Sequence, residues 1–186
     1  MILSTALVNW FSNAWAVLLL FLIPIGGGIP AGVVLAQKRG LEWPVMMVLY
    51  LISDIILACL FEPVMLLFVQ LGRRSQLVSR VLASFKKSMD KTILKYGVNP
   101  SPFTLIMVAF GVDPMTGRTV ALAAGHSFVS GWTLAIIGDM LFFVVLMMST
   151  LWLNNILGDG TWAAVIVTFS MMGAHALAKK VRHYFS

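Results

Sequence analysis

The stretch Pro24-Ile-Gly-Gly-Gly-Ile-Pro30-Ala-Gly32 decides how this chain can fold. Three consecutive glycines between two prolines interrupt a helix, because glycine weakens a helix and proline lacks a backbone donor. Apolar runs of membrane length lie on both sides of the stretch. Non-helical backbone at membrane depth is tolerated only where protein or an aqueous cavity surrounds it. The sequence therefore predicts a broken helix at the tip of a hairpin, formed by Pro24, Gly26, Gly27, Gly28 and Pro30.

Composition indicates that a lipid bilayer is the solvent. Of the 186 residues, 60% are apolar and 11% are charged, whereas about a quarter of the residues of a soluble domain carry charge. The net charge of +6 does not indicate a nucleic-acid partner, because the basic residues gather in residues 73–98 and at the C-terminus, beside apolar segments. Apolar residues recur every three or four positions along residues 73–98, with Lys and Arg between them. This pattern predicts a basic amphipathic helix on anionic headgroups, or alternatively a solvated cytoplasmic linker helix.

A second break, Asp113-Pro114-Met-Thr-Gly117-Arg118, follows the apolar residues 102–112. Shifting the sequence on itself by 85 residues aligns three pairs of identical Gly or Asp residues: Gly32 with Gly117, Gly40 with Gly125, and Asp54 with Asp139. The shift predicts an internal repeat, with Pro114 and Gly117 at the tip of the second hairpin. Repeats with broken helices at matching positions are a feature of transporters that bind their substrate near the membrane midplane.

The placement of charge predicts the topology. Basic residues favour the cytoplasm, so residues 73–98 and the C-terminus should both be cytoplasmic. Residues 102–130 must then enter the membrane and return, and residues 6–43 form the matching hairpin from the outside. Lys38 and Arg39 would lie on the outer side, against the same rule. Ordinary membrane crossings in place of the hairpins are the alternative.

The predicted fold is an all-α polytopic membrane protein, with an inverted repeat of two re-entrant helical hairpins plus transmembrane helices. It forms a single membrane domain over residues 1–186. The predicted parts are a first half-repeat (1–72), a cytoplasmic basic helix (73–98), a second half-repeat (99–156), and a final transmembrane helix with a basic tail (157–186).

These residues resemble the DedA membrane-protein family, which carries the VTT or SNARE-associated domain. The first half of the family is matched by Pro24 to Gly32, Gly40, Ser53-Asp54 and Leu71-Gly72-Arg73-Arg74, and the second half by Tyr96-Gly97, Pro114, Gly117-Arg118-Thr119 and Ala124-Gly125. The Pro-x-x-Gly pieces are also similar to the related small multi-drug export family. The resemblance covers about residues 20–145 and implies a bacterial inner-membrane protein with two inverted re-entrant hairpins. It also implies membership in a group that contains lipid-carrier flippases and lipid scramblases.

Two departures from the family pattern concern its charged residues. DedA proteins usually carry a Glu in the first hairpin, where this chain has Gly26, Gly27 and Gly28. They carry two arginines around the Pro of the second hairpin, whereas only Arg118 matches here and Asp113 lies near the place of the other.

An ionisable side chain inside a membrane segment costs about 2.5–3.5 kcal/mol on insertion scales. The candidates for substrate or proton binding are Asp54, Glu62, Asp113, Arg118, His126 and Asp139. Asp54 and Glu62 are eight residues apart, so on one helix they lie about 12 Å apart on roughly the same side. A buried carboxyl can bind a proton near neutral pH, as a proton-coupled carrier requires.

Each candidate also has a structural interpretation. The structural alternative for Asp54 and Asp139 is that they cap the ends of the hairpin helices or pair with Arg118. Arg118 could contact an anion such as a phosphate headgroup, or form a salt bridge with Asp113. His126 could relay protons, or pack through a hydrogen bond.

Enzymatic motifs are missing from the sequence, which has no zinc-binding His-Glu-x-x-His and no phosphate-binding Gly-x-x-x-x-Gly-Lys. We therefore expect no enzyme, no cofactor and no metal site. The leading hypothesis is a DedA-like transporter or flippase for a lipid-linked or small amphiphilic substrate, with or without coupling to protons. The alternative is a non-transporting membrane subunit that docks a partner through residues 73–98. Expected partners are membrane lipids, the amphiphilic substrate, and a second copy of the chain or a partner membrane protein.

Overall fold

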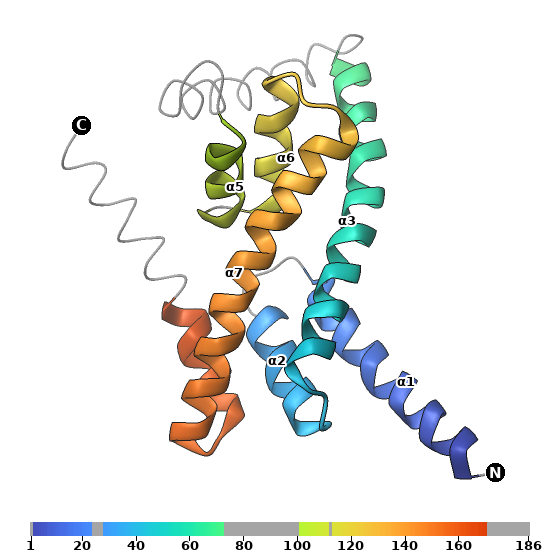
Figure 1. Cartoon of the computed structure of the whole chain (residues 1–186), viewed down its shortest axis with the longest axis vertical. Coiled ribbons are helices and arrows are strands. Elements are labelled where there is room, and N and C mark those ends of the chain that lie inside the picture. The colour runs from blue at the N-terminus through green and yellow to red at the C-terminus, as the bar shows by residue number, and fades with distance from the viewer. Residues whose placement is uncertain (1, 24–27, 73–100, 112, 171–186) are drawn as a thin grey trace. The chain divides into compact units, whose positions relative to one another are not determined.

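The computed structural model describes residues 2–23, 28–72, 101–111 and 113–170, and every regular element among them is a helix. In chain order these are α1 (Ile2–Phe21), α2 (Gly28–Lys38), α3 (Trp43–Gly72), α5 (Pro102–Gly111), α6 (Pro114–Ala123) and α7 (Phe128–Leu157), followed by a helix over Gly160–Ser170 (Figure 1). The prediction of an all-α chain is confirmed for these residues. The predicted basic helix at 73–98, the basic tail, and Pro24, Gly26 and Gly27 lie outside the described residues.

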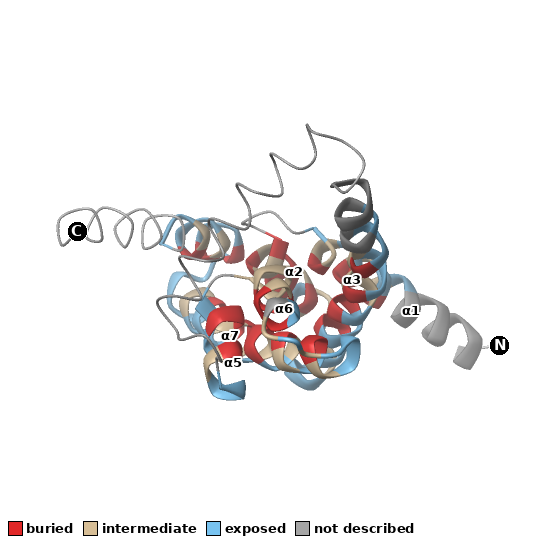
Figure 2. Cartoon of the chain, turned by 90° about the horizontal axis from the view of Figure 1, so that it is seen from above, coloured by how far each residue is buried: buried red, intermediate tan, exposed pale blue. Residues whose placement is uncertain are grey.

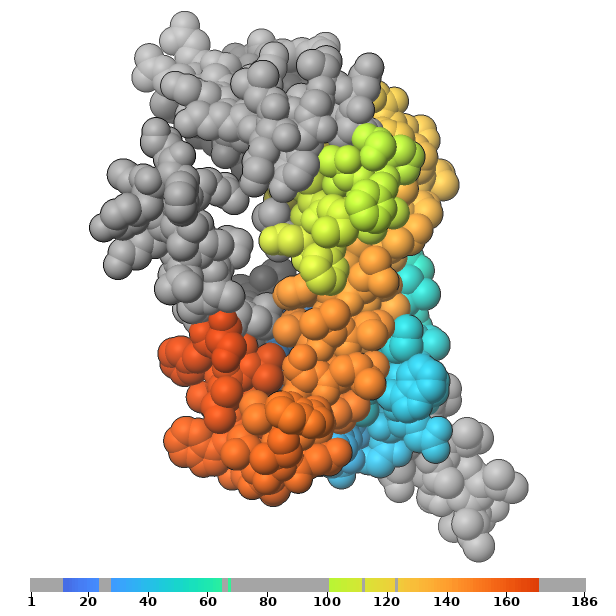
Figure 3. Space-filling view, turned by 60° about the vertical axis from the view of Figure 1, so that its left-hand side comes forward, coloured from blue at the N-terminus to red at the C-terminus, as the bar shows by residue number. Residues whose placement is uncertain are grey.

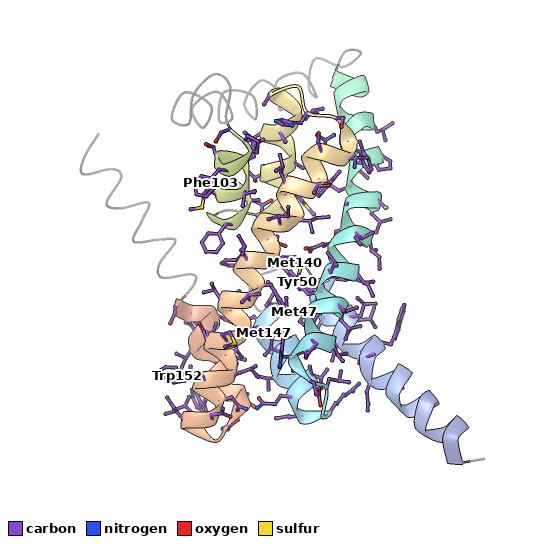
Figure 4. All side chains as sticks on the ribbon, in the orientation of Figure 1. Met47, Tyr50, Phe103, Met140, Met147 and Trp152 are labelled. Atoms are coloured by element: carbon purple, nitrogen blue, oxygen red, sulfur yellow. The ribbon has the colours of Figure 1, made fainter. Side chains whose placement is uncertain are left out.

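In the described part of the chain, two helices are long and apolar enough to cross a membrane. They are the Trp43–Val64 part of α3, with 22 residues, and the whole of α7, with 30 residues. Only 33% of the most apolar part of α3 and 39% of that of α7 are buried, whereas a core helix of a soluble protein would be mostly buried. Large apolar side chains such as Phe103 and Trp152 point away from the helices (Figure 4) and are 70% and 67% exposed. This distribution fits an apolar solvent around the helices.

The described helices fall into two compact units. Unit 1 comprises Met1–Ser53 and Phe143–Ser186, and unit 2 comprises Asp54–Phe142. In unit 1, α1 packs against α2. Phe21 of α1 makes edge-on ring contacts with Tyr50 and with Phe143, at 5.4 Å between centroids in each case, and the rings of Tyr50 and Phe143 stack at 4.0 Å. These aromatic rings anchor the end of α1 to α3 and α7.

In unit 2, α5 and α6 form a helical pair that packs on α7. A Cβ atom at Gly117 of α6 would lie 2.7 Å from the Cβ of Ala109 on α5, so the two helices approach closely there. A Cβ atom at Gly138 of α7 would collide with the Ile106 carbonyl oxygen of α5. The space-filling view shows α5 lying directly against α7 (Figure 3). Small residues at these positions allow helix contact of the kind common in membrane proteins.

The structure describes some of the residues that were predicted at the two hairpin tips, and they lie at the starts of helices. Gly28 and Pro30 belong to the first turn of α2, and Pro114 is the first residue of α6. Proline is accommodated in the first turn of a helix because the N–H at that position has no partner within the helix. Only residues 112 and 113 lie between α5 and α6.

Within unit 2, α3 and α7 run antiparallel. Asp54 lies beside Asp139, and Glu62, two turns further along α3, lies beside Trp132, two turns earlier on α7. Between these two levels, Ala58 and Ala135 belong to the same buried cluster. The chain direction of α3 is therefore opposite to that of α7 in this unit.

The ends of the elements follow the offset of 85 residues. The 30-residue helices α3 and α7 begin at Trp43 and Phe128. After α2 and after α6 the chain turns at Gly40 and Gly125, whose φ angles are 69° and 83°. In both turns the following backbone N–H donates to a helix carbonyl five residues earlier, at 2.9 Å. Glycine is the residue that takes this left-handed conformation without strain.

Candidate functional site

Among the described residues of unit 2, four charged side chains are buried: Asp54, Glu62, Arg118 and Asp139, which are 3%, 8%, 1% and 5% exposed. Buried residues of unit 2 lie on the inward sides of its helices (Figure 2). Large apolar side chains are exposed on the same helices, including Leu60 on α3. Charge therefore lies inside the helical bundle and apolar surface outside. Ionisable residues within membrane segments characteristically face the bundle interior in this way.

The first site is a three-helix cluster of Arg118, Glu62 and Trp132, which come from α6, α3 and α7. Arg118 donates from Nε to Glu62 Oε2 at 3.0 Å and from Nη2 to Glu62 Oε1 at 2.6 Å. Trp132 donates from Nε1 to Glu62 Oε2 at 2.8 Å. The planar guanidinium matches the carboxylate with two parallel bonds, which is the strong form of this pair. The positive charge of Arg118 is thus compensated by Glu62.

A glycine on α7 makes room for the guanidinium. A Cβ atom at Gly131 would lie 2.8 Å from Arg118 Nη1 and 3.4 Å from the Cβ of Ala121. Arg118 can lie flat between α6 and α7 only because Gly131 has no side chain. Among the described residues, Nη1 has no hydrogen-bond partner.

The second site is the carboxyl pair of Asp54 and Asp139, in the interior of α3 and α7. The two carboxyl groups lie close enough to interact directly. Asp54 Oδ2 is buried and has no hydrogen-bond partner within the described part of the chain. Ionisation of both members of such a neighbouring pair is unfavourable, so the pair is a candidate for proton binding.

The structure gives Asp113 and His126 roles at the two ends of α6. Asp113 caps the helix, accepting from the Thr116 backbone N–H at 2.7 Å and from the Thr116 hydroxyl at 2.6 Å. The backbone N–H of His126 donates to the Ala121 carbonyl and closes the turn that follows α6. The alternative prediction that Arg118 forms a salt bridge with Asp113 is wrong, because Arg118 pairs with Glu62.

The helix-capping interpretation of Asp54 and Asp139 is also wrong, since both lie well inside 30-residue helices. Sequence reasoning did not single out Trp132, Gly131 or Gly138. A signal for Trp132 exists in the spacing. If Asp54 lies beside Asp139 on antiparallel helices, the residue two turns beyond Asp54 must lie beside the residue two turns before Asp139.

The described residues contain no group of three or more His, Cys, Asp or Glu side chains that could hold a metal ion.

Comparison with family models, with curated proteins and with solved structures gives no match for this chain. The resemblance to the DedA family accordingly rests on the sequence motifs alone.

Proposed function

We propose that this protein is a multi-pass membrane transporter, DedA-like in fold, that moves a lipid-linked or small amphiphilic substrate in exchange for protons. The observation that carries the proposal is the pair of buried, neighbouring carboxyl groups of Asp54 and Asp139. Two carboxyl groups are costly inside a membrane, and such groups usually mark ion or proton pathways. Neighbouring carboxyls that share a proton bind and release protons as a pair.

The helical arrangement supports a transporter rather than a simple anchor. Each long helix is preceded by two helices that pack on each other: α1 with α2 before α3, and α5 with α6 before α7. The matching helix bounds at an offset of 85 residues support an internal repeat. The antiparallel run of α3 and α7 in unit 2 supports its inversion, with both pairs as re-entrant hairpins. In inverted-repeat transporters the binding site lies where broken helices meet near the midplane.

We place the protein in the bacterial inner membrane, with residues 73–98 and the C-terminus in the cytoplasm. The support is the concentration of Lys and Arg in those segments, since positive charge is retained on the cytoplasmic side.

The role of Arg118 follows from its partner. Because Glu62 already compensates its charge, an anionic headgroup could bind Arg118 only by displacing Glu62. In this proposal the Arg118, Glu62 and Trp132 cluster fixes the α6 helix to α3 and α7, and the carboxyl pair exchanges the proton.

The test combines a spectroscopic and a transport measurement on the full chain. Infrared spectra recorded against pH should show a protonated-carboxyl band that is altered by Asp54→Asn and by Asp139→Asn. Proteoliposomes loaded with fluorescent amphiphiles of either charge should show transport that depends on an imposed pH gradient and is lost in both variants. Asp113→Asn is the matched control, because it removes a carboxylate outside the pair and Asn also caps helices well.

Two results would refute this function. One is native transport with undiminished pH dependence in both pair variants. The other is the absence of any carboxyl band that responds to those substitutions.

A further inference from the structure

Exposed tryptophans gather in one of the two units. Of the five tryptophans whose side chains the structure describes, four are 60–67% exposed: Trp15, Trp43, Trp152 and Trp162. All four belong to unit 1, whereas the fifth, Trp132, is buried in unit 2. An indole joins a large apolar ring to one N–H donor, so it favours the boundary between hydrocarbon and water.

Contacts of Arg39 place two of these tryptophans at one level of unit 1. Arg39 directly follows α2, and its Nη1 donates to the backbone carbonyl oxygens of Ser12 and Asn13 in α1, at 3.3 and 3.2 Å. Trp15 is two residues further along α1, which corresponds to about 3 Å along the helix axis. Trp43 follows Arg39 across a short turn and is the first residue of α3. Both indoles therefore lie near the level at which α2 ends.

Contacts of Asn154 place the other two tryptophans at the same level. Near the end of α7, Asn154 donates from Nδ2 to Gln37 Oε1 of α2 at 2.6 Å. A Cβ atom at Gly160, where the last helix begins, would lie 3.1 Å from Asn154 Oδ1. Trp152 and Trp162 are two residues from Asn154 and Gly160, again about 3 Å along each helix. We call this end of unit 1, where the four exposed tryptophans lie, the tryptophan level.

The tryptophan level separates apolar surface from polar surface. Val145 on α7 and Phe169 on the last helix, which turns back beside α7 (Figure 1), are exposed and lie about 10 Å further from the turn. The turns and helix ends at the level itself expose polar side chains, namely Lys38, Glu42, Asn155 and Asp159. Ile156 and Leu157 are exposed there too, which fits a lipid boundary better than bulk water. The order of apolar residue, indole and polar residue is that of a segment passing from lipid tails to headgroups.

The charged side chains at the tryptophan level balance. Among the described residues they are two basic ones, Lys38 and Arg39, and two acidic ones, Glu42 and Asp159. This surface therefore offers no excess positive charge to anionic lipids, in contrast to residues 73–98, which contain seven Lys and Arg residues.

We propose that the tryptophan level of unit 1 binds the phospholipid headgroup layer of the outer leaflet, anchored by its indole rings and not by its charges. The assignment to the outer leaflet rests on the proposed function, whose topology places residues 73–98 in the cytoplasm. The length of α3 supports it, because 30 residues span about 45 Å, the thickness of a bilayer with its headgroups. A helix that begins among one set of headgroups at Trp43 thus reaches the other set directly before residues 73–98.

The experiment measures depth in the bilayer with nitroxide spin labels on the full chain, in phosphatidylcholine vesicles with or without phosphatidylglycerol. Labels are attached to Trp15→Cys, Trp43→Cys, Trp152→Cys and Trp162→Cys in a Cys59→Ala background, so three tryptophans remain in each variant. Collision with oxygen, which concentrates in hydrocarbon, is compared with collision with a water-soluble nickel chelate. We expect all four labels within the headgroup layer, which is about 5–8 Å thick. The matched controls Val145→Cys and Phe169→Cys should lie about 10 Å deeper. Neither phosphatidylglycerol nor salt should shift these depths.

Several outcomes would overturn the inference. They are tryptophan-site labels at the same depth as the controls, labels in bulk water, and depths that change with phosphatidylglycerol or salt. Exclusion of both oxygen and nickel from the four sites would assign the surface to a protein partner or a second copy of the chain.

A separate measurement tests the side of the membrane. A membrane-impermeant maleimide should modify Asn155→Cys in right-side-out vesicles and spare it in inside-out vesicles. The reverse result would refute both the outer leaflet and the proposed topology. Headgroup depth without pH-driven transport would leave the inference standing and refute the proposed function. Transport with the labels in water or mid-bilayer would refute the inference alone.

Discussion

The substitution Glu62→Gln tests the charge balance of the buried cluster. It keeps the size of the side chain and one acceptor oxygen, but it leaves Arg118 without a counter-charge at 1% exposure. Glu62 accepts two hydrogen bonds from Arg118 and one from Trp132. Hydrogen bonds to charged groups contribute about 1.5–3 kcal/mol each. Breaking a buried ion pair by removing one partner costs about 3–5 kcal/mol, because the remaining charge stays buried. We therefore expect the free energy of unfolding to fall by about that amount.

The assay is reversible unfolding of the purified chain in mixed micelles of a mild and a denaturing detergent, followed by circular dichroism. The control replaces both charges with apolar groups, as Glu62→Leu with Arg118→Met. Because no lone charge then remains, the double variant should be more stable than Glu62→Gln. Trp132→Phe removes only the indole donor and should cost about 1 kcal/mol. Surface substitutions usually change the free energy of unfolding by no more than about 0.5 kcal/mol. If Glu62→Gln changed it by no more than that, Arg118 would not be held by Glu62.

Four further outcomes are expected. Gly138→Leu should separate α7 from α5 and lower the unfolding free energy by about 1–3 kcal/mol, the range for overpacking, in the same detergent titration. Gly125→Ala places a side chain at a φ of 83° and should destabilise by more than about 0.4–1 kcal/mol, whereas the same change at a relaxed glycine would stabilise. Asp113→Ala should cost about 1 kcal/mol through loss of the α6 cap, and Asp113→Asn should recover most of it. The backbone N–H of Thr161 donates to Asp159 at 2.8 Å and holds the pKa of that exposed carboxyl below its ordinary value. The stabilisation from this contact is therefore complete above the unfolded pKa of about 3.9 and is lost as the pH falls through the lowered folded value. A carbon-13 NMR titration that gives an ordinary pKa for the Asp159 carboxyl would contradict this prediction.

Composition and local sequence pattern were sufficient to predict an all-helical protein in an apolar environment. Sixty per cent apolar residues with sparse charge require a bilayer-like environment, and helices are the element that satisfies its own backbone there. The breaks near Pro30 and Pro114 could be located because glycine and proline act within a turn of their own position. The positions of the long helices could also be predicted, because their extents follow the apolar runs closely.

The partners of the charged residues depended on the tertiary structure. Arg118 pairs with a residue 56 positions away and not with Asp113, its acidic neighbour along the chain. Asp54 and Asp139 were recognised as costly charges from sequence, but their proximity depends on α3 and α7 running antiparallel in one particular register. The residue type of Trp132 gave no signal, because an indole in an apolar segment resembles any other hydrophobic residue until its N–H meets a carboxylate, and its spacing became informative only once Asp54 and Asp139 were known to be neighbours.

The sequence alone thus indicated an apolar solvent, the helical elements and the few charges that needed an explanation. Only the tertiary structure decided which charges neutralise each other and which carboxyl groups become neighbours. The physical reason is range: solvent preference and helix breaking act within a few residues, whereas the compensation of a buried charge depends on which atoms of distant helices lie within hydrogen-bond distance.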